Sequence, residues 1–205
     1  MVDKAKTHPK ENAEKGAPHT ATDRSDVSAS TVRIGVISDT HGVLDPTVLE
    51  VFAGVVQIIH AGDIVDPDIL TRLESVAPVV AVAGNIDPPE LSERLPREAG
   101  GVVAGVRYVV GHKKKRLVKR LAAGDLTDRA VGERPDLVVF GHDHVPSAAW
   151  VDGTLYLNPG SASAPDEEDD GPTVAIVEVR PTGLAVLFVP LARHDMRDLT
   201  TRYLR

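Results

Sequence analysis

The chain has 205 residues, of which 42% are hydrophobic and 26% charged, and this balance fits one globular domain with a substantial core. It has no cysteine, which excludes disulfides, iron–sulfur clusters and thiolate zinc sites, so any metal ligands must be Asp, His or Asn. A net charge of -7 and an aromatic content of 3% argue against stable nucleic-acid binding, which usually needs a basic face or stacking rings.

The first 31 residues differ in composition from the rest. They contain no Leu, Ile or aromatic residue, and five Lys or Arg balance five Asp or Glu. We expect a disordered tail over residues 1–31 and one domain over residues 32–205. No apolar run reaches the ~18 residues of a membrane span, and the N-terminus lacks an apolar signal core, so the expected location is cytoplasmic, without membrane contact.

The first apolar run ends abruptly in polar residues. Val32–Ile37 alternates β-branched residues as a buried strand does, and Ser38-Asp39-Thr40-His41-Gly42 follows it. In extended backbone, Asp39 and His41 would leave the same side of the strand and converge on one ion. An isolated Asp-x-His is weak evidence, so its meaning depends on partners elsewhere in the chain.

The same unit then repeats. The pattern predicts a helix from Asp45-Pro46 to near Gly54, a strand over Val55–Ala61, a helix opened by Pro67 and a strand over Pro78–Ala83. This βαβαβ order predicts a parallel sheet, in which ligands bind outside the carboxyl ends of the strands. Gly62-Asp63 and Gly84-Asn85 follow the second and third strands, so their side chains join the predicted site.

The second half is predicted to be β-rich, with one basic helix. In order, we expect a hairpin of Val102–Val103 with Arg107–Val110, a helix over Lys113–Leu121 with Leu117, Val118 and Leu121 inwards, a strand over Leu137–Phe140, a hairpin of Ala148–Val151 with Thr154–Leu157, and a hairpin of Val174–Val179 with Leu184–Val189. After Ala192 we expect a short helix or tail. Two of these strands also end in histidines, at Gly111-His112 and at Gly141-His142-Asp143-His144.

The polar strand ends together form a specific set. The motifs are Ser38-Asp39-Thr40-His41-Gly42, His60-Ala61-Gly62-Asp63, Val82-Ala83-Gly84-Asn85, Gly111-His112, Phe140-Gly141-His142-Asp143-His144 and Asn158-Pro159-Gly160-Ser161. Over most of residues 32–190, this set closely resembles the calcineurin-like metallophosphoesterase superfamily, in its small single-domain bacterial and archaeal phosphodiesterase branch. The resemblance implies an α/β (α+β) fold, a four-layer αββα sandwich of two mixed β-sheets flanked by helices. It also implies a metal-dependent phosphodiesterase or phosphatase that hydrolyses a small phosphate ester.

The resemblance also assigns the metal ligands. One divalent ion would be held by Asp39, His41 and His144, the other by Asn85, His112 and His142, and Asp63 would bridge both. A hydroxide bridging the ions would attack phosphorus in line, so that Asp63, Asn85 and His112 act through metal and water and no side chain is the nucleophile. Mn²⁺ is the expected activating ion, with Fe, Zn, Ni and Mg left open by the ligand types. Similar proteins often form homodimers or homotetramers.

Two positions depart from the superfamily pattern. Much of the superfamily has a His after the Gly-Asn, which stabilises the transition state or protonates the leaving group, whereas this chain has Ile86. The branch usually shows Thr-His-Gly-His at the fifth strand end, whereas this chain has Gly111-His112-Lys113-Lys114. Ile86 keeps open an alternative from another class, a catalytically weak or inactive scaffold such as the small retromer subunit of similar fold.

Several residues near the motifs have structural interpretations. His60 lies inside an apolar strand, so we favour a buried, hydrogen-bonded role over metal ligation. Asp87 and Asp143 are interpreted as turn or supporting groups rather than ligands. The basic cluster Lys113-Lys114-Lys115-Arg116, with Lys119 and Arg120, would ordinarily form a solvated helix face. We hypothesise instead that one or two of these residues attract the phosphate substrate.

Overall fold

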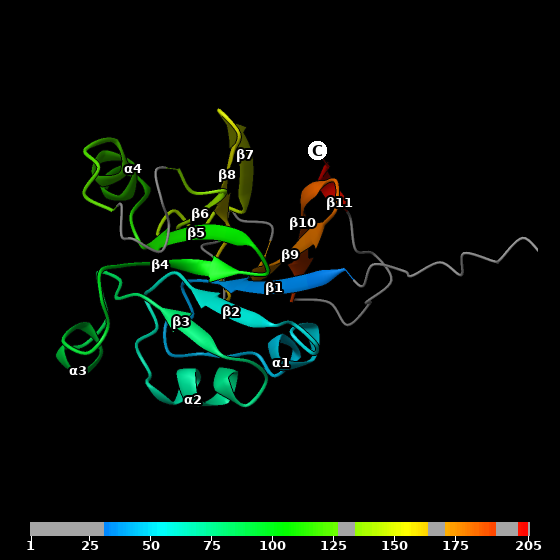
Figure 1. Cartoon of the computed structure of the whole chain (residues 1–205). Coiled ribbons are helices and arrows are strands. Elements are labelled where there is room, and N and C mark those ends of the chain that lie inside the picture. Colours follow the sequence, from blue (N-terminus) through cyan, green and yellow to red (C-terminus); the bar gives the residue numbers. More distant parts are fainter. Residues whose placement is uncertain (1–30, 127–133, 164–170, 192–200, 205) are drawn as a thin grey trace, which may run out of the picture.

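The computed structural model describes residues 31–126, 134–163, 171–191 and 201–204, which form two sheets and four helices (Figure 1). The predicted tail therefore lies outside the described residues, except for Thr31. The elements in chain order are β1 (Val32–Ile37), α1 (Thr47–Val51), β2 (Gln57–His60), α2 (Asp68–Glu74), β3 (Val79–Ala81), α3 (Pro89–Ser92), β4 (Glu98–Val103), β5 (Val106–Gly111), α4 (Lys114–Ala122), β6 (Leu137–Val139), β7 (Ser147–Val151), β8 (Thr154–Asn158), β9 (Thr173–Arg180), β10 (Gly183–Pro190) and β11 (Thr201–Leu204).

Both sheets mix parallel and antiparallel strands. The first has the order β11-β10-β9-β1-β2-β3, with β1, β2 and β3 parallel and β9, β10 and β11 antiparallel to their neighbours. The second has the order β4-β5-β6-β8-β7, in which β5, β6 and β8 are parallel. The parallel strands in both sheets mean that several carboxyl ends can meet at one edge.

The layers follow from strands that bury both faces. In β1, Ile34 and Val36 pack into the core between the two sheets, whereas Ile37 packs with α1 and α2 on the outer face. In the second sheet, Val109 and Val138 pack outwards against Leu117 of α4. Figure 1 shows α1 and α2 beneath the first sheet and α4 beyond the second. The predicted four-layer αββα sandwich of two mixed sheets is therefore confirmed.

Most predicted elements are present, with three corrections. The expected helix or tail after Ala192 is wrong for residues 201–204, which form strand β11 on the edge of the first sheet. Val118 was expected to face inwards on α4 but is 38% exposed. The chain also contains α3, a short helix that the pattern did not predict, where Pro89 occupies the first helical turn.

Within the described part of the chain, no helix combines the length and the apolar character that crossing a bilayer requires.

Candidate metal centre

The structure brings all seven predicted site residues to one end of the two sheets. They lie in the five loops that follow β1, β2, β3, β5 and β6, as the strand-end argument predicts. Six of them form two groups of three, and within each group the ligand atoms all lie within 4.8 Å of one another. We call Asp39, His41 and His144 the Asp39 cluster, and we call Asp63, His112 and His142 the Asp63 cluster.

The Asp39 cluster aims three ligand atoms at one point. Asp39 is fully buried, and its Oδ1 lies 3.5 Å from His144 Nε2 and 3.8 Å from His41 Nε2. The two imidazole nitrogens are themselves 3.2 Å apart, with the rings edge to face. Among the described residues Asp39 Oδ1 has no hydrogen-bond partner. A buried carboxylate oxygen without a donor is costly, so this geometry suits a bound cation.

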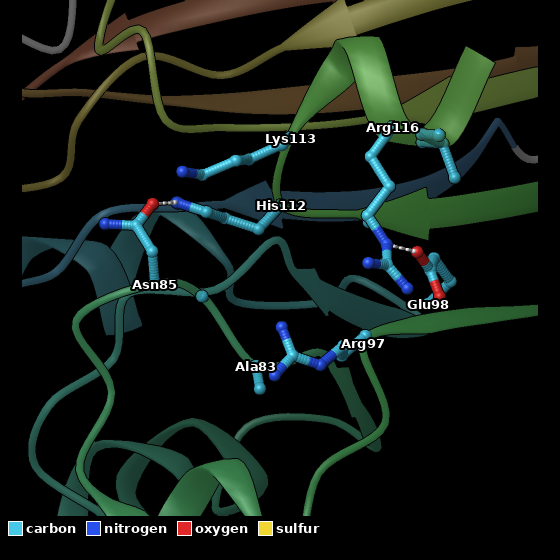
Figure 2. A pocket seen from close by; sticks show the side chains of 10 residues that line it. Ala83, Asn85, Arg97, Glu98, His112, Lys113 and Arg116 are labelled. Carbon is cyan, nitrogen blue, oxygen red and sulfur yellow. Dashed lines mark hydrogen bonds and ion pairs between the residues drawn. The ribbon is translucent and has the colours of Figure 1, made fainter. Parts of the chain in front are cut away.

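The Asp63 cluster satisfies its polar atoms internally. Asp63 Oδ1 accepts a hydrogen bond of 3.0 Å from Ile86 N, and Asp63 Oδ2 lies 3.2 Å from His112 Nε2. Asn85 belongs here too, because its Oδ1 is 3.0 Å from the same Nε2 (Figure 2). On the other side of the ring, His112 Nδ1 lies 2.9 Å from Ala61 O, a carbonyl that can only accept. Nδ1 therefore carries a proton, which leaves Nε2 as the atom that could bind a metal.

Protonation in the Asp63 cluster reflects these contacts. Burial pushes the pKa of Asp63 up, but hydrogen bonds from His112 and from the backbone at Ile86 and Asn85 outweigh it, so the pKa is lowered. Burial likewise lowers the pKa of His112, but the bond and charge of Asp63 outweigh it, so this pKa is raised. The pKa of His142 is lowered by burial, then by the charges of Lys113 and His112. Without a metal, a proton on His112 takes the place of the cation.

The backbone at the site differs from the expected geometry. We expected Asp39 and His41 to leave the same side of an extended strand end, but both have positive φ, at 54° and 47°. Asp63, His142 and His144 share this left-handed conformation, with φ of 54°, 73° and 57°. Non-glycine residues rarely adopt it, and clusters of such residues mark functional sites where the surrounding structure enforces the strain. Convergence therefore results from tight turns rather than from strand alternation.

Two glycines allow the loops to approach closely. A Cβ on Gly84 would overlap Asp63 Oδ1 and the backbone nitrogen of Asp63. A Cβ on Gly141 would overlap Ser38 Oγ, beside Asp39. Each cluster thus depends on one position where only glycine fits.

Asp87 holds together the loops behind the Asp63 cluster. It is 9% exposed, and its Oδ1 accepts hydrogen bonds from Ile64 N at 2.6 Å and Val65 N at 2.7 Å. Its Oδ2 accepts from Gly84 N at 2.7 Å, next to Asn85. The predicted supporting role is consistent with this geometry. Asp143, in contrast, is exposed and makes no side-chain contact of this kind with the described residues.

The Asn158–Ser161 loop supports the Asp39 cluster. Ser161 Oγ donates to Asp39 O at 2.9 Å, and Ser163 Oγ donates to the same carbonyl at 3.1 Å. Asn158 Nδ2 donates to Gly141 O at 3.2 Å, next to His142. This motif therefore holds the first and last ligand loops in place rather than contributing a ligand.

His60 is buried and hydrogen-bonded, as predicted. Burial, followed by the charge of His112, lowers its pKa from 6.5 to about 3, so the ring is neutral. Its Nδ1 accepts a bond of 3.2 Å from Gly62 N, so Nε2 carries the proton and donates to Thr40 Oγ1 at 3.2 Å. His60 thereby links the loops after β1 and β2, which carry Asp39 and Asp63.

The first two lysines of the predicted basic cluster, Lys113 and Lys114, lie in different surroundings. Lys113 lines a cleft beside Asn85 and His112, whereas the ammonium of Lys114 lies 4.9 Å from the centre of the Phe140 ring. Arg116 of the predicted basic cluster also lines this cleft, together with Arg97 and Glu98, which no sequence pattern indicated. Their proximity arises from the packing of α4 against the β4–β5 hairpin, which no local pattern reveals.

The residues present fit divalent metal ions. Imidazole nitrogens, carboxylate oxygens and one amide oxygen suit borderline and hard divalent cations. The unpartnered Asp39 Oδ1, facing two Nε2 atoms, is the strongest local indication.

Comparisons with known proteins agree with this geometry. Residues 32–182 match the family model described as the calcineurin-like phosphoesterase superfamily domain. The chain is 36% identical over 146 residues to a probable metallophosphoesterase of Methanocaldococcus jannaschii, covering 68% of this chain and 72% of the relative. It is 32% identical over 158 residues to a probable metallophosphoesterase of Methanothermobacter thermautotrophicus, covering 71% and 85%.

Solved structures share the fold at lower identity. A structure described as a novel archaeal phosphodiesterase aligns with a TM-score of 0.59 and 21% identity, covering 77% of this chain and 100% of that one. Vps29 of Entamoeba histolytica, solved with Zn²⁺, aligns with a TM-score of 0.63 and 19% identity, covering 80% and 95%.

Proposed function

Since this chain belongs to the calcineurin-like phosphoesterase superfamily, we propose that it is a phosphodiesterase whose centre holds two divalent ions. The family makes it a metal-dependent phosphoesterase, a hydrolase of phosphate esters. The observation that carries the finer proposal is the presence of two separate three-residue donor groups, side by side at the ends of parallel strands.

The proposed ligand set follows the two clusters. Asp39, His41 and His144 would hold one ion, while Asn85, His112 and His142 would hold the other, and Asp63 would bridge them. Only Asp39 and Asp63 in this set are acidic, so they would neutralise only part of the charge of two divalent ions. The remaining positive charge would attract a phosphate group.

The protein's contribution is to position these donors. Two bound divalent ions would supply a hydroxide nucleophile for in-line attack and would stabilise the charge on the phosphoryl oxygens. Ala61 O fixes the tautomer of His112, and Ile86 N fixes the Asp63 carboxylate. Both contacts orient the ligand atoms before substrate arrives, which is the role of outer hydrogen bonds at metal sites.

The proposed preference for diesters rests on the similarity to the archaeal phosphodiesterase, whereas Ile86 bears on the leaving group. Its side chain is 49% exposed at the position where much of the superfamily has a proton-donating His. An isoleucine cannot protonate a leaving group, so substrates with good leaving groups are favoured.

We propose Mn²⁺ as the activating ion, because mixed imidazole and oxygen donors suit it. We also propose a cytoplasmic location and a homodimer or homotetramer, which cell fractionation and light scattering would test.

A catalytically inactive scaffold is the second candidate. It is favoured by Ile86 and by the similarity in fold to Vps29. Against it stands the intact donor set, in which each of the seven side chains is of a type that binds metal and lies beside the others. A scaffold would not need a buried carboxylate oxygen left without a donor.

Hydrolysis of two chromogenic substrates tests the proposal. With added Mn²⁺, the protein should hydrolyse bis-p-nitrophenyl phosphate faster than p-nitrophenyl phosphate. Asp63→Ala should lower kcat/KM for the diester by at least about a hundredfold, since even outer-contact changes at metal sites cost ~10- to 100-fold. Asp68→Ala, the same change at an exposed position, serves as the matched control. Equal rates for wild type and Asp63→Ala would exclude catalysis at this centre.

A further inference from the structure

The cleft beside the Asp63 cluster is an extension of the metal centre. It has a volume of about 170 Å³ and is bounded on one side by Asn85 and His112 (Figure 2). Its opposite wall is formed by Arg97, Glu98 and Arg116, with Lys113 at the top of the view. A substrate bound at the metal centre would therefore have one of its arms beside this cleft.

The charges in the cleft are not balanced. Glu98 is engaged by two arginines, with Arg116 Nε at 2.5 Å and Arg120 Nη1 at 2.7 Å. Arg97 and Lys113, in contrast, form no ion pair with any acidic group of the described residues, although the chain as a whole carries a net charge of -7. Figure 2 shows the Arg97 guanidinium extending towards Ala83 and Lys113 running above His112 towards Asn85. Two cations without an acidic partner among the described residues therefore line this cleft, one on each side of His112.

The size of the cleft limits what it can hold. Sites for whole small molecules are typically about 300–1,000 Å³, well above the 170 Å³ found here. That volume suits one charged group rather than a nucleobase. A guanidinium recognises phosphate with two parallel hydrogen bonds, and a neighbouring ammonium adds a point charge.

We propose that this cleft binds a second phosphate group of the substrate, through Arg97 and Lys113. The substrate class is thus a phosphodiester with a phosphate monoester on one arm, as in a phosphorylated nucleotide diester. This inference rests on the proposed function, because it assigns the scissile phosphate to the metal centre. Arg116 belongs to the wall, where Glu98 holds it.

A matched pair of substrates tests the cleft. Thymidine 5′-(p-nitrophenyl phosphate) carries only the scissile phosphate, and its 3′-phosphorylated counterpart adds the second phosphate without changing the leaving group. In wild type with Mn²⁺, kcat/KM should favour the second substrate by at least about tenfold, through a lower KM, because charge-assisted hydrogen bonds are worth roughly that factor or more.

Two double variants separate the cleft from overall charge. In Arg97→Gln/Lys113→Gln, the preference should fall to about one. Arg94→Gln/Lys115→Gln removes the same charges from exposed positions outside the cleft and should keep the preference. Retention of the preference in the first variant, its loss in the second, or no preference in wild type would overturn the proposal.

A binding measurement keeps this test separate from catalysis. Calorimetry should show that thymidine 3′,5′-bisphosphate binds the Mn²⁺-loaded protein at least about tenfold more tightly than thymidine 5′-monophosphate, with the same dependence on the two double variants. If neither chromogenic diester is hydrolysed, the phosphodiesterase proposal fails, and the calorimetry alone decides the cleft. If both are hydrolysed equally and both nucleotides bind equally, only the cleft proposal fails.

Discussion

The two clusters each contain a buried carboxylate, but they differ in whether that carboxylate is hydrogen-bonded without a metal ion. In the Asp63 cluster, Ile86 N and His112 Nε2 contact the two oxygens of the Asp63 carboxylate, and the same Nε2 contacts Asn85 Oδ1. The carboxylate therefore has hydrogen-bond partners even without a cation. In the Asp39 cluster, a fully buried carboxylate oxygen faces two imidazole nitrogens and receives no hydrogen bond from the described residues. The first arrangement must give up a proton to bind metal. The second is held in a costly geometry that a metal would relieve.

This difference predicts opposite effects of the same substitution on the metal-free protein. In Asp39→Asn, the amide oxygen could accept from His142 N as Asp39 Oδ2 does now, while the amide nitrogen could donate to the unprotonated one of the two facing Nε2 atoms. We therefore expect stabilisation by about 1–3 kcal/mol. In Asp63→Asn, the charged partner of His112 is lost, so we expect destabilisation by about 1.5–3 kcal/mol.

Urea denaturation in the presence of a chelator measures both effects. Both variants should nevertheless lose hydrolysis and gain less stability from added Mn²⁺ than wild type, because a ligand that binds only the native state raises its stability. Asp68→Asn controls for the loss of one negative charge at an exposed site. Destabilisation by both substitutions would show that Asp39 Oδ1 is satisfied without metal, and the contrast between the clusters would disappear.

The pH dependence of metal binding sharpens the contrast. The pKa of His112 is raised chiefly because the bond and charge of Asp63 outweigh burial, and metal binding needs its neutral form. Below that raised pKa the proton must leave, so affinity at the Asp63 cluster should fall by about tenfold per pH unit as pH decreases, and should level off above it. The same proton stabilises the metal-free fold, fully below pH ~6.5 and less as pH rises through the raised pKa.

Calorimetry on Asp39→Ala isolates the Asp63 cluster for this measurement. Titration with Mn²⁺ in two buffers of different ionisation enthalpy should show about one proton released per ion below the raised pKa. An affinity that does not change between pH 6 and pH 8 would contradict the protonated state assigned to His112.

Much of this site could be predicted from the chain because its ligands follow apolar strands. The end of a buried parallel strand can be located in the sequence, because its apolar run stops there. Asp63 and Asn85 lie at the strand ends that the βαβαβ order predicts. The turn geometry could not be predicted, because positive φ at Asp39 and His41 is imposed by contacts with the loop after β2, such as the bond of 3.0 Å from His41 N to Asp63 O. Non-glycine residues give no local signal for that conformation.

The cleft and strand β11 were missed for a similar reason. Arg97 follows Pro96 in a stretch without periodicity, and its role depends on α4, which lies beyond the next two strands in the chain. Thr201–Leu204 is too short and too polar to read as a strand, and its pairing with β10 defines it. Properties that depend on tertiary neighbours are therefore the ones that the sequence left open.

The supports of the clusters differ in a smaller, measurable way. Asp39 O accepts hydrogen bonds from both Ser161 and Ser163, so loss of one hydroxyl leaves the other in place. We expect Ser161→Ala to cost about 1 kcal/mol, the typical worth of one neutral hydrogen bond, and Ser161→Ala/Ser163→Ala to cost more than the sum of the single changes. The excess would arise because only the double variant leaves the buried carbonyl without a side-chain donor. Thermal unfolding of wild type, both single variants and the double variant completes a double-mutant cycle. Metal occupancy, measured at each cluster, shows which of the two clusters is affected. Strict additivity would mean that the two hydroxyls act independently, and a loss of metal at the Asp63 cluster would mean that the two supports are coupled rather than distinct.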